Sequence, residues 1–585
     1  MPPNGKYILL FLIMVAAMIL LPGLLMPYNM DDAGQAQQGL YIQDMLHGGN
    51  FFLPMEHGTI FASKPPMYNW LALPFCSLFG LNEITIKIPT FFMSIGMVIV
   101  VFLFAYRIYK SRFVASISVL LLLTSYGFIR GAGIARPDML LSLSVLAALY
   151  FFYVYYSQEP GKKQGRTLSG AYLSLAIGTL TKGPVNLVLV FAPLIIFIIL
   201  DRNGKTVREA MSGFFSSAHV KGWLLFFFLV LLWFIPAVLY GKWPFVHIVF
   251  IREMFFRVVD PSQMAGRTQP AWYFLPYFIG WFMPWTIFLA GVYFTRKKIY
   301  ETFTGSEKGI RLLFITLIST LIFFSIPKGK RCDYIILMYP CGAMLVAGLF
   351  GFLRANAGNL GAVNGKIAFL FRIAIALMFI TGLLMILIYS TGIFDSAMVK
   401  FVTRRLRDTA EGNPHEHAML LKNSLFMLFI GIITLLSALT ALALQIRKRH
   451  ASLVAVILLC FACLNMAYAT WILPFFETKL SIKPFCDEIQ KTVKTEGPLY
   501  FAFVNSNELF FRLGKNVPNT RIKEITRAAG EKGRVYAIMP KDKEKELEQT
   551  CKDATFRVIS TSAVKKNGDY QVLVAISRKD RDETD

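Results

Sequence analysis

Long apolar runs constrain this chain of 585 residues more than any other feature of its sequence. Three examples are YILLFLIMVAAMILLPGLLM, FFMSIGMVIVVFLFAY and GWLLFFFLVLLWFIPAVLY. Each is close to the roughly 20 apolar residues with which a helix crosses the hydrocarbon of a bilayer. The composition agrees, since 55% of the residues are hydrophobic and only 16% are charged. We therefore predict a polytopic membrane protein whose backbone hydrogen bonds close within helices.

Basic residues are concentrated in alternate connections between the apolar runs. These connections are RIYKSR, QEPGKKQGR, DRNGKTVREA, TRKKIYETFTGSEKGIR and RKRH. All fall on one side if the N-terminus is cytoplasmic, as the positive-inside rule predicts. The formal net charge of +25 is explained in this way, and no nucleic-acid-binding signature accompanies it. The pattern predicts about thirteen spans, an extracytoplasmic C-terminus, and a split at TKGP of the run 171–200 into two shorter helices.

The opposite face is where we expect catalytic residues. It receives the first loop (about residues 27–83), RGAGIARPD, TKGP, the segment 241–272, PKGKRCDY, a polar loop near 395–422 and the C-terminal tail.

The chain changes character near its C-terminal end. Residues 1–475 are predicted to form the transmembrane domain, and residues 476–585 a small soluble α/β domain of ordinary domain size. FCDEIQKTV and KDKEKELEQTC are typical of helices, while PLYFAFV, RVYAIMP and YQVLVAIS are typical of strands. No nucleotide-binding or zinc-protease motif occurs in this domain, so we expect it to have a supporting role.

Three aspartates on the extracytoplasmic face are candidates for chemistry. Asp31 and Asp32 follow the first apolar run directly, and Asp138 in RGAGIARPDML begins a later one. Carboxylates at a membrane surface can serve as a general base or bind a cation. An aspartate at the start of a helix can equally be a cap that satisfies backbone N–H groups. Both interpretations stay open for all three.

Several cations lie on this face, where the positive-inside rule predicts few. Lys64 lies in FASKPPMYNW, Lys182 in TLTKGPVN, and Lys328, Lys330 and Arg331 in SIPKGKRCDY. Lys182 stands between two apolar segments, where an unpaired ammonium is costly and usually functional. Clustered cations at an interface suit a phosphate head group, although side chains that reach toward anionic lipid explain any one of them.

The order of these segments resembles a known family. DD after the first run, SKPPMYNWL, LFGLNEITIKIPT, ARPDML, LTKGP, QPAWYFLPYFIGWFMPW and SIPKGKRCDYIILMYP are similar to the GT-C glycosyltransferases of the aminoarabinose (lipid A) transferase and protein O-mannosyltransferase type. The match runs from about Asp31 to Pro340. The C-terminal domain resembles the periplasmic domain of the bacterial aminoarabinose transferases.

The resemblance implies an α-helical membrane protein of GT-C type that transfers a sugar from a polyprenyl (undecaprenyl) phosphate donor with inversion. The expected acceptor is lipid A or another envelope glycolipid, with a protein acceptor as the nearest alternative, and the expected location is a bacterial inner membrane with a periplasmic active site. The resemblance makes Asp31 or Asp32 the catalytic base and gives Asp138 a part in shaping the site. It assigns the lipid phosphate to Lys64, Lys182, Lys328, Lys330 and Tyr334.

Several residues depart from the pattern of the resembled family. Asp32 stands where the family usually has Glu, Asp333 replaces a common His, and Ser63 replaces the Glu that often precedes KPP. Ser63 cannot supply a carboxylate to a metal, so we expect no metal or other cofactor and leave metal dependence open.

A rival hypothesis is a transporter or flippase for an anionic lipid, which would also need buried cations and many spans. It would not require a carboxylate placed as a base, so the three aspartates discriminate between the two hypotheses.

Overall fold

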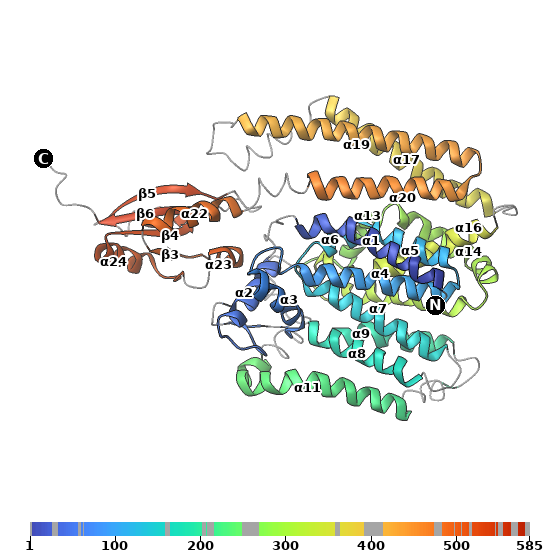
Figure 1. Cartoon of the computed structure of the whole chain (residues 1–585), viewed down its shortest axis with the longest axis horizontal. Helices are drawn as coiled ribbons and strands as arrows, with labels where there is room; N and C mark the ends of the chain where they lie inside the picture. Colours follow the sequence, from blue (N-terminus) through green and yellow to red (C-terminus); the bar gives the residue numbers. More distant parts are fainter. Residues whose placement is uncertain are drawn as a thin grey trace.

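A computed structural model gives the architecture (Figure 1). It describes residues 3–25, 33–56, 60–62, 64–157, 164–201, 206, 216–247, 268–356, 363–390, 414–472, 482–496, 498–504, 506–513, 517–543, 546–547, 554–562 and 571–578. A large bundle of roughly aligned helices carries a small α/β domain at one end, and α2 (Ala33–Leu46) and α3 (Met67–Phe79) lie at that same end. The predicted fold class, a helical membrane protein with a small C-terminal α/β domain, is confirmed.

Within these residues, nine helices are long and apolar enough to cross a membrane. They include α1 (Pro3–Leu25), α4 (Ile88–Tyr109), α7 (Pro137–Tyr156), α11 (Ser217–Val246), α15 (Glu307–Ser325), α16 (Met338–Ala355) with the short η5 (Cys332–Ile335) before it, α17 (Val363–Ser390), α19 (Pro414–Ile446) and α20 (His450–Ala467). The number rises to 11 if two bent pairs are each one span. One pair is α5 (Arg112–Leu123) with α6 (Tyr126–Ala132); the other is η4 (Ala271–Tyr273) and α13 (Phe274–Trp281) with α14 (Trp285–Thr302). The predicted count of about thirteen would need α8 (Gln164–Lys182) and α9 (Val185–Leu200) as well, and it stays a prediction.

The predicted break at TKGP is confirmed. Helix α8 (Gln164–Lys182) ends at this motif and α9 (Val185–Leu200) begins immediately after it. Gly183 takes a left-handed φ of +75°, which a glycine adopts at no steric cost, and Pro184 cannot donate a backbone hydrogen bond to continue α8. Because of the break, Lys182 is the last residue of α8.

The centre of the bundle is occupied by α16. Its most apolar stretch is wholly buried, whereas only 22% of the corresponding stretch of α11 is buried. Glycines let neighbouring helices approach α16 closely, because a Cβ at Gly348 would lie 2.4 Å from the Tyr109 hydroxyl of α4. Large apolar side chains on α11, such as Leu239 with 72% exposure, face outward as expected for contact with lipid.

The C-terminal domain is built on a mixed sheet of order β3-β4-β6-β5. The strands are β3 (Leu499–Phe501), β4 (Arg534–Pro540), β5 (Ala554–Thr561) and β6 (Gln571–Arg578); β3 runs parallel to β4 and the other pairs are antiparallel. The helices are α22 (Lys483–Glu496), α23 (Asn507–Leu513) and α24 (Ile522–Lys532). Alternate residues of β4 point to opposite faces, so Val535 and Ala537 belong to the buried cluster that includes α24, while Tyr536 and Ile538 belong to the cluster that includes α22 and α23.

The sequence located part of this domain. Strands β3, β4 and β6 and helix α22 were predicted, whereas β5, α23 and α24 were not. The helix predicted at KDKEKELEQTC is described only as a 3-10 turn (Lys541–Lys543) and two helical residues, 546–547. The predicted domain boundary at 475/476 lies outside the described residues, so the division into 1–475 and 476–585 stays a prediction.

Candidate functional site

Two of the predicted site residues, Asp31 and Asp32, lie outside the described residues, as does Ser63. The chain around the two aspartates is nevertheless bracketed by α1, which ends at Leu25, and by α2, which begins at Ala33. The remaining predicted site residues, from Lys64 to Tyr334, are described.

Asp138 is a buried carboxylate at the beginning of α7. Pro137 is the first residue of this helix, and Arg136 is its N-cap residue. The interpretation of Asp138 as an N-cap is therefore wrong. Its carboxylate instead accepts a hydrogen bond from the ammonium of Lys182, and only 5% of the Asp138 side chain and 9% of the Lys182 side chain are exposed.

Lys182 also contacts an aromatic ring. Its Nζ lies 4.0 Å from the centroid of the Tyr334 ring, a distance that favours a cation–π interaction. Tyr334 belongs to η5, and its ring packs against Phe324 with centroids 5.3 Å apart. Three segments that are distant in the sequence, RPDML, TKGP and KRCDY, therefore meet around one ammonium group.

A second group of charges lies beside this pair. The buried carboxylate of Asp333 forms ion pairs with Arg130 and with Arg136, whose Nη1 is 3.6 Å from Oδ2 of Asp333. The guanidinium of Arg130 also stacks on Trp281, 5.0 Å from its centroid. Sequence reasoning did not select Arg130 or Arg136. The signal was available, because both stand in RGAGIARPD on the face where the spans predict few cations.

The other predicted lysines differ in their surroundings. Lys64 is half-buried, and its charge acts on Asp138 together with those of Lys182 and Arg136. The buried ammonium of Lys330 donates to the backbone carbonyl of Gln269 at 3.1 Å and to that of Pro327, so it fastens two loops together. The Lys328 side chain is exposed, and its backbone carbonyl accepts a hydrogen bond from the Gln269 N–H at 3.0 Å.

The first loop contacts the RGAGIARPD segment directly. Oε1 of Gln35, in the first turn of α2, accepts a hydrogen bond from the Ala135 N–H at 2.9 Å. On the other side, the Thr90 hydroxyl donates to the Ile134 carbonyl at 3.0 Å. The structure thus brings together the first loop, RGAGIARPD, TKGP and PKGKRCDY, which the sequence had placed on one face.

The balance of charge in this site is positive. Asp138 and Asp333 are outnumbered by Lys64, Arg130, Arg136, Lys182 and the neighbouring Arg331. Guanidinium and ammonium groups held at low exposure form strong charge-assisted hydrogen bonds to phosphate oxygens. The arrangement is therefore suited to an anionic group at the end of a membrane bundle.

One protein family and several known proteins are similar in sequence to this chain. The family described as dolichyl-phosphate-mannose-protein mannosyltransferase matches residues 6–252. An uncharacterized protein of Aquifex aeolicus is 27% identical over 306 residues, which is 52% of this chain and 56% of that protein. The undecaprenyl phosphate-alpha-4-amino-4-deoxy-L-arabinose arabinosyl transferase of Enterobacter sp. (strain 638) is 27% identical over 338 residues, 57% of this chain and 58% of the relative. The chain thus matches little more than half the length of these relatives.

The similarity to a solved structure extends further along the chain. The crystal structure of ArnT from Cupriavidus metallidurans bound to undecaprenyl phosphate matches with a TM-score of 0.69 and 17% identity, over 96% of this chain and 97% of that one. Because so little of either chain is left out, the shared architecture includes the C-terminal domain.

Proposed function

We propose that this chain, a GT-C fold membrane protein of the aminoarabinose transferase and protein O-mannosyltransferase type, is an inverting glycosyltransferase that takes its sugar from a polyprenyl phosphate. The observation that carries the proposal is the buried Asp138–Lys182 pair beneath Tyr334, with Lys64 and Arg136 beside it. Desolvated cations of this kind stabilise negative charge far more strongly than the same groups in water.

The cations have a defined part in the proposed reaction. When an acceptor hydroxyl attacks the anomeric carbon, the bond to the lipid phosphate breaks and negative charge grows on the departing phosphate oxygen. Lys64 and Lys182, with the hydroxyl of Tyr334, would hold that phosphate, and Lys328 and Lys330 would extend the positive surface around it. Asp138 fixes the ammonium of Lys182 through its hydrogen bond, so it acts as a positioning residue.

The base is assigned to Asp31 or Asp32 in the first loop. A carboxylate there would take the proton of the acceptor hydroxyl as the hydroxyl attacks. Support comes from Gln35, which lies just beyond these aspartates and is hydrogen-bonded to Ala135, three residues before Asp138. Attack from the side opposite the phosphate inverts the anomeric centre in one displacement, and the phosphate is the leaving group from the start.

The name of one relative supports a proposal for the donor, and the resemblance to the aminoarabinose transferases extends the proposal to the acceptor and the location. The printed name of the Enterobacter relative specifies an undecaprenyl phosphate sugar, which we propose as the donor class here. For the acceptor we propose lipid A or a related envelope glycolipid, and for the location the bacterial inner membrane with this site on the periplasmic side. The family match favours a protein as the second acceptor class.

The decisive experiment is sugar transfer by the purified protein in detergent. Polyprenyl phosphate sugars are offered with lipid A or with a peptide as acceptor, to the wild type and to Asp31→Asn, Asp32→Asn, Lys64→Ala and Lys182→Ala. One of the two aspartate variants should lose about 100-fold or more in kcat while it still binds the donor. The lysine variants should instead weaken donor binding. The exposed pair of Lys308 with Asp201 supplies a control, since Lys308→Ala should leave transfer unchanged.

A transporter or flippase would give a different result. It would bind the lipid phosphate through the same cations, yet transfer nothing to either acceptor and keep its flux in liposomes when Asp31 and Asp32 are both replaced by asparagine. That outcome would contradict the glycosyltransferase.

A further inference from the structure

The C-terminal domain does not rest on the membrane domain through a polar surface alone; the two share one hydrophobic core. Ala36 and Leu40 of α2 belong to the same buried cluster as Phe510 and Phe511 of α23. Ala135, which precedes Asp138 by three residues, belongs to that cluster as well. The C-terminal domain is therefore packed against α2, which in turn is hydrogen-bonded through Gln35 to Ala135, near the proposed site.

The packing between α2 and α23 is close at one glycine. A Cβ added to Gly39 would lie 2.3 Å from a ring carbon of Phe511, a distance that real structures do not show. Gly39 lies one helical turn after Gln35, so the same face of α2 contacts Phe511 and Ala135. A displacement of α23 would therefore be passed to the beginning of α2.

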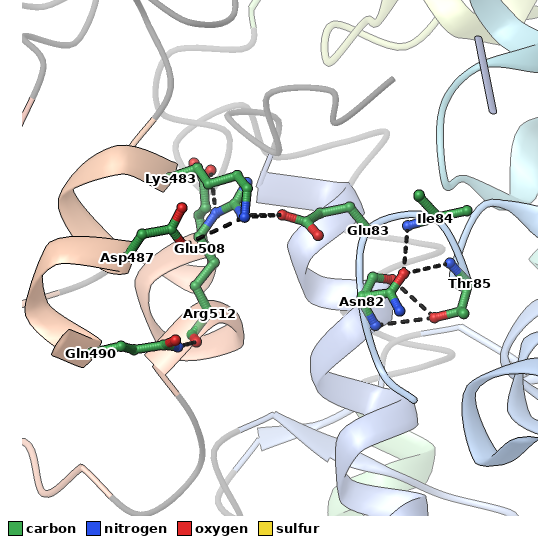
Figure 2. A network of polar contacts seen from close by, with 9 residues as sticks. All are labelled: Asn82, Glu83, Ile84, Thr85, Lys483, Asp487, Gln490, Glu508 and Arg512. Atoms are coloured by element: carbon green, nitrogen blue, oxygen red, sulfur yellow. Dashed lines mark hydrogen bonds and ion pairs between the residues drawn. The ribbon is translucent and has the colours of Figure 1, made fainter. Parts of the chain in front are cut away.

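Charged residues also tie α23 to a second part of the membrane domain, the turn between α3 and α4 (Figure 2). Arg512 of α23 forms ion pairs with Glu508 of its own helix, at 3.0 Å, and with Glu83 in the turn before α4. Lys483 of α22 lies 3.9 Å from the same Glu83 carboxylate. Only 6% of the Arg512 side chain is exposed, and only 14% of that of Glu83. Charges so poorly hydrated depend on their partners, so loss of one partner is costly.

The turn that carries Glu83 is itself rigidly held. Oδ1 of Asn82 accepts hydrogen bonds from the N–H groups of Ile84 and Thr85, each at 3.0 Å (Figure 2). Glu83 is thus a fixed point on the membrane domain, to which Arg512 ties α23.

We propose that α23 is a positioning element for the first loop: it holds α2, which follows Asp31 and Asp32 in the sequence, in register with the Asp138 site. The catalytic consequence rests on the proposed function, while the positioning itself does not. A base displaced by about 1 Å can cost about 100-fold in rate, so a domain that supplies none of the proposed site residues can still control turnover.

The test compares Arg512→Ala with the wild-type full-length protein by hydrogen exchange and mass spectrometry. Amide exchange in α2 (Ala33–Leu46) should rise at least tenfold, while β4 and β6 keep their protection and so report that the C-terminal domain is still folded. Arg527→Ala is the matched control, because this arginine forms an exposed ion pair with Glu531 in the same domain. It should leave α2 unchanged.

A second variant approaches the contact from the other side. Glu83→Gln removes the charge on the membrane domain and does not alter the C-terminal domain, and we expect the same rise in α2 exchange. If α2 exchange is unchanged in both Arg512→Ala and Glu83→Gln, the positioning role is overturned.

Kinetics then separate this inference from the proposed function. Arg512→Ala should lower kcat at least tenfold and leave the KM for the lipid donor within twofold, because the cations that hold the phosphate are not moved. A kcat equal to that of the wild type would overturn the proposal. A wild type that transfers no sugar, with α2 still loosened in Arg512→Ala, would contradict the glycosyltransferase while the positioning of α2 by α23 stands.

Discussion

Asp138 and Lys182 form a buried ion pair in which each charge depends on the other. Removing water from two charges is costly, and each charge offsets that cost only while its partner is present. Asp138 is also near the positive charges of Arg136 and Lys64, in addition to that of Lys182. An ion pair of this kind contributes more to a defined geometry than to stability, and a binding site for a phosphate needs that geometry.

We expect Lys182→Met to lower the thermal stability of the protein strongly, by on the order of 3 kcal/mol, because it leaves a buried carboxylate without its hydrogen-bonded partner. The double variant Asp138→Asn with Lys182→Met should recover part of this loss. Lys308→Met, which breaks the ion pair of an exposed lysine with Asp201, should cost less than about 1 kcal/mol. Unfolding followed by tryptophan fluorescence in detergent measures all three, and equal losses for the two single variants would contradict the buried pair.

The thiol of Cys486 can serve as a probe of the contact between the two domains. Burial raises the pKa of Cys486 to about 12, so almost none of it is thiolate at pH 8. We expect iodoacetamide to leave Cys486 unmodified in the native wild type and to modify it faster in Arg512→Ala, as measured by mass spectrometry of its peptide. Arg527→Ala should behave as the wild type does. Equal rates in Arg512→Ala and Arg527→Ala would show that Arg512 does not hold this region closed.

At the scale of elements, the break between α8 and α9 decides where Lys182 stands. An uninterrupted helix would place the residues around TKGP on a regular spiral through the membrane. The left-handed Gly183 and the following Pro184 end α8 instead, and they leave the ammonium at a helix end beside Asp138 and Tyr334.

Gly183→Ala is expected to cost about 1 to 2 kcal/mol, because an L-residue is strained at positive φ. A Cβ at Gly183 meets no atom within 4 Å, so the cost would come from the backbone and not from a clash. Gly165→Ala is the control: this exposed glycine lies inside α8, has equally open surroundings, and should gain up to about 1 kcal/mol. Thermal unfolding of the two variants checks the difference, and equal effects would exclude the strained conformation.

At the scale of the whole molecule, the two domains are joined by charge as well as by apolar packing. Burial by itself would raise the pKa of Glu83, but the nearby Arg512 and Lys483 outweigh it and hold the pKa below its ordinary value of 4.5. A carboxylate with a lowered pKa in the folded state stabilises that state above its unfolded pKa. This contribution is lost as the pH falls through the folded pKa.

The wild type should therefore be more stable than Glu83→Gln at pH 7, and the difference should disappear as the pH is lowered below about 4.5 toward 3. Melting temperatures of both proteins across this range provide the measurement. A difference that stays constant down to pH 3 would show that Glu83 does not titrate with folding.

The sequence by itself determined the features that depend on local chemistry. The apolar runs predicted spanning helices because a backbone in hydrocarbon must satisfy its own hydrogen bonds. The motif TKGP predicted the break between α8 and α9, the segments RVYAIMP and YQVLVAIS predicted β4 and β6, and the order of short motifs indicated the GT-C fold. Apart from the order of the motifs, each of these follows from residues close together in the chain.

Tertiary structure decided which charges are partners. Asp333 pairs with Arg130 across a separation of 203 residues, whereas Lys330 donates to backbone carbonyls. In the sequence, Asp333 and Lys330 are both simply charged residues of one loop on the extracytoplasmic face. The docking of α23 on α2 was equally hidden, because a short helix gives little periodic signal and its partner was a glycine. Burial and long-range geometry select ion-pair partners, and neither is written in the spacing of residues along the chain.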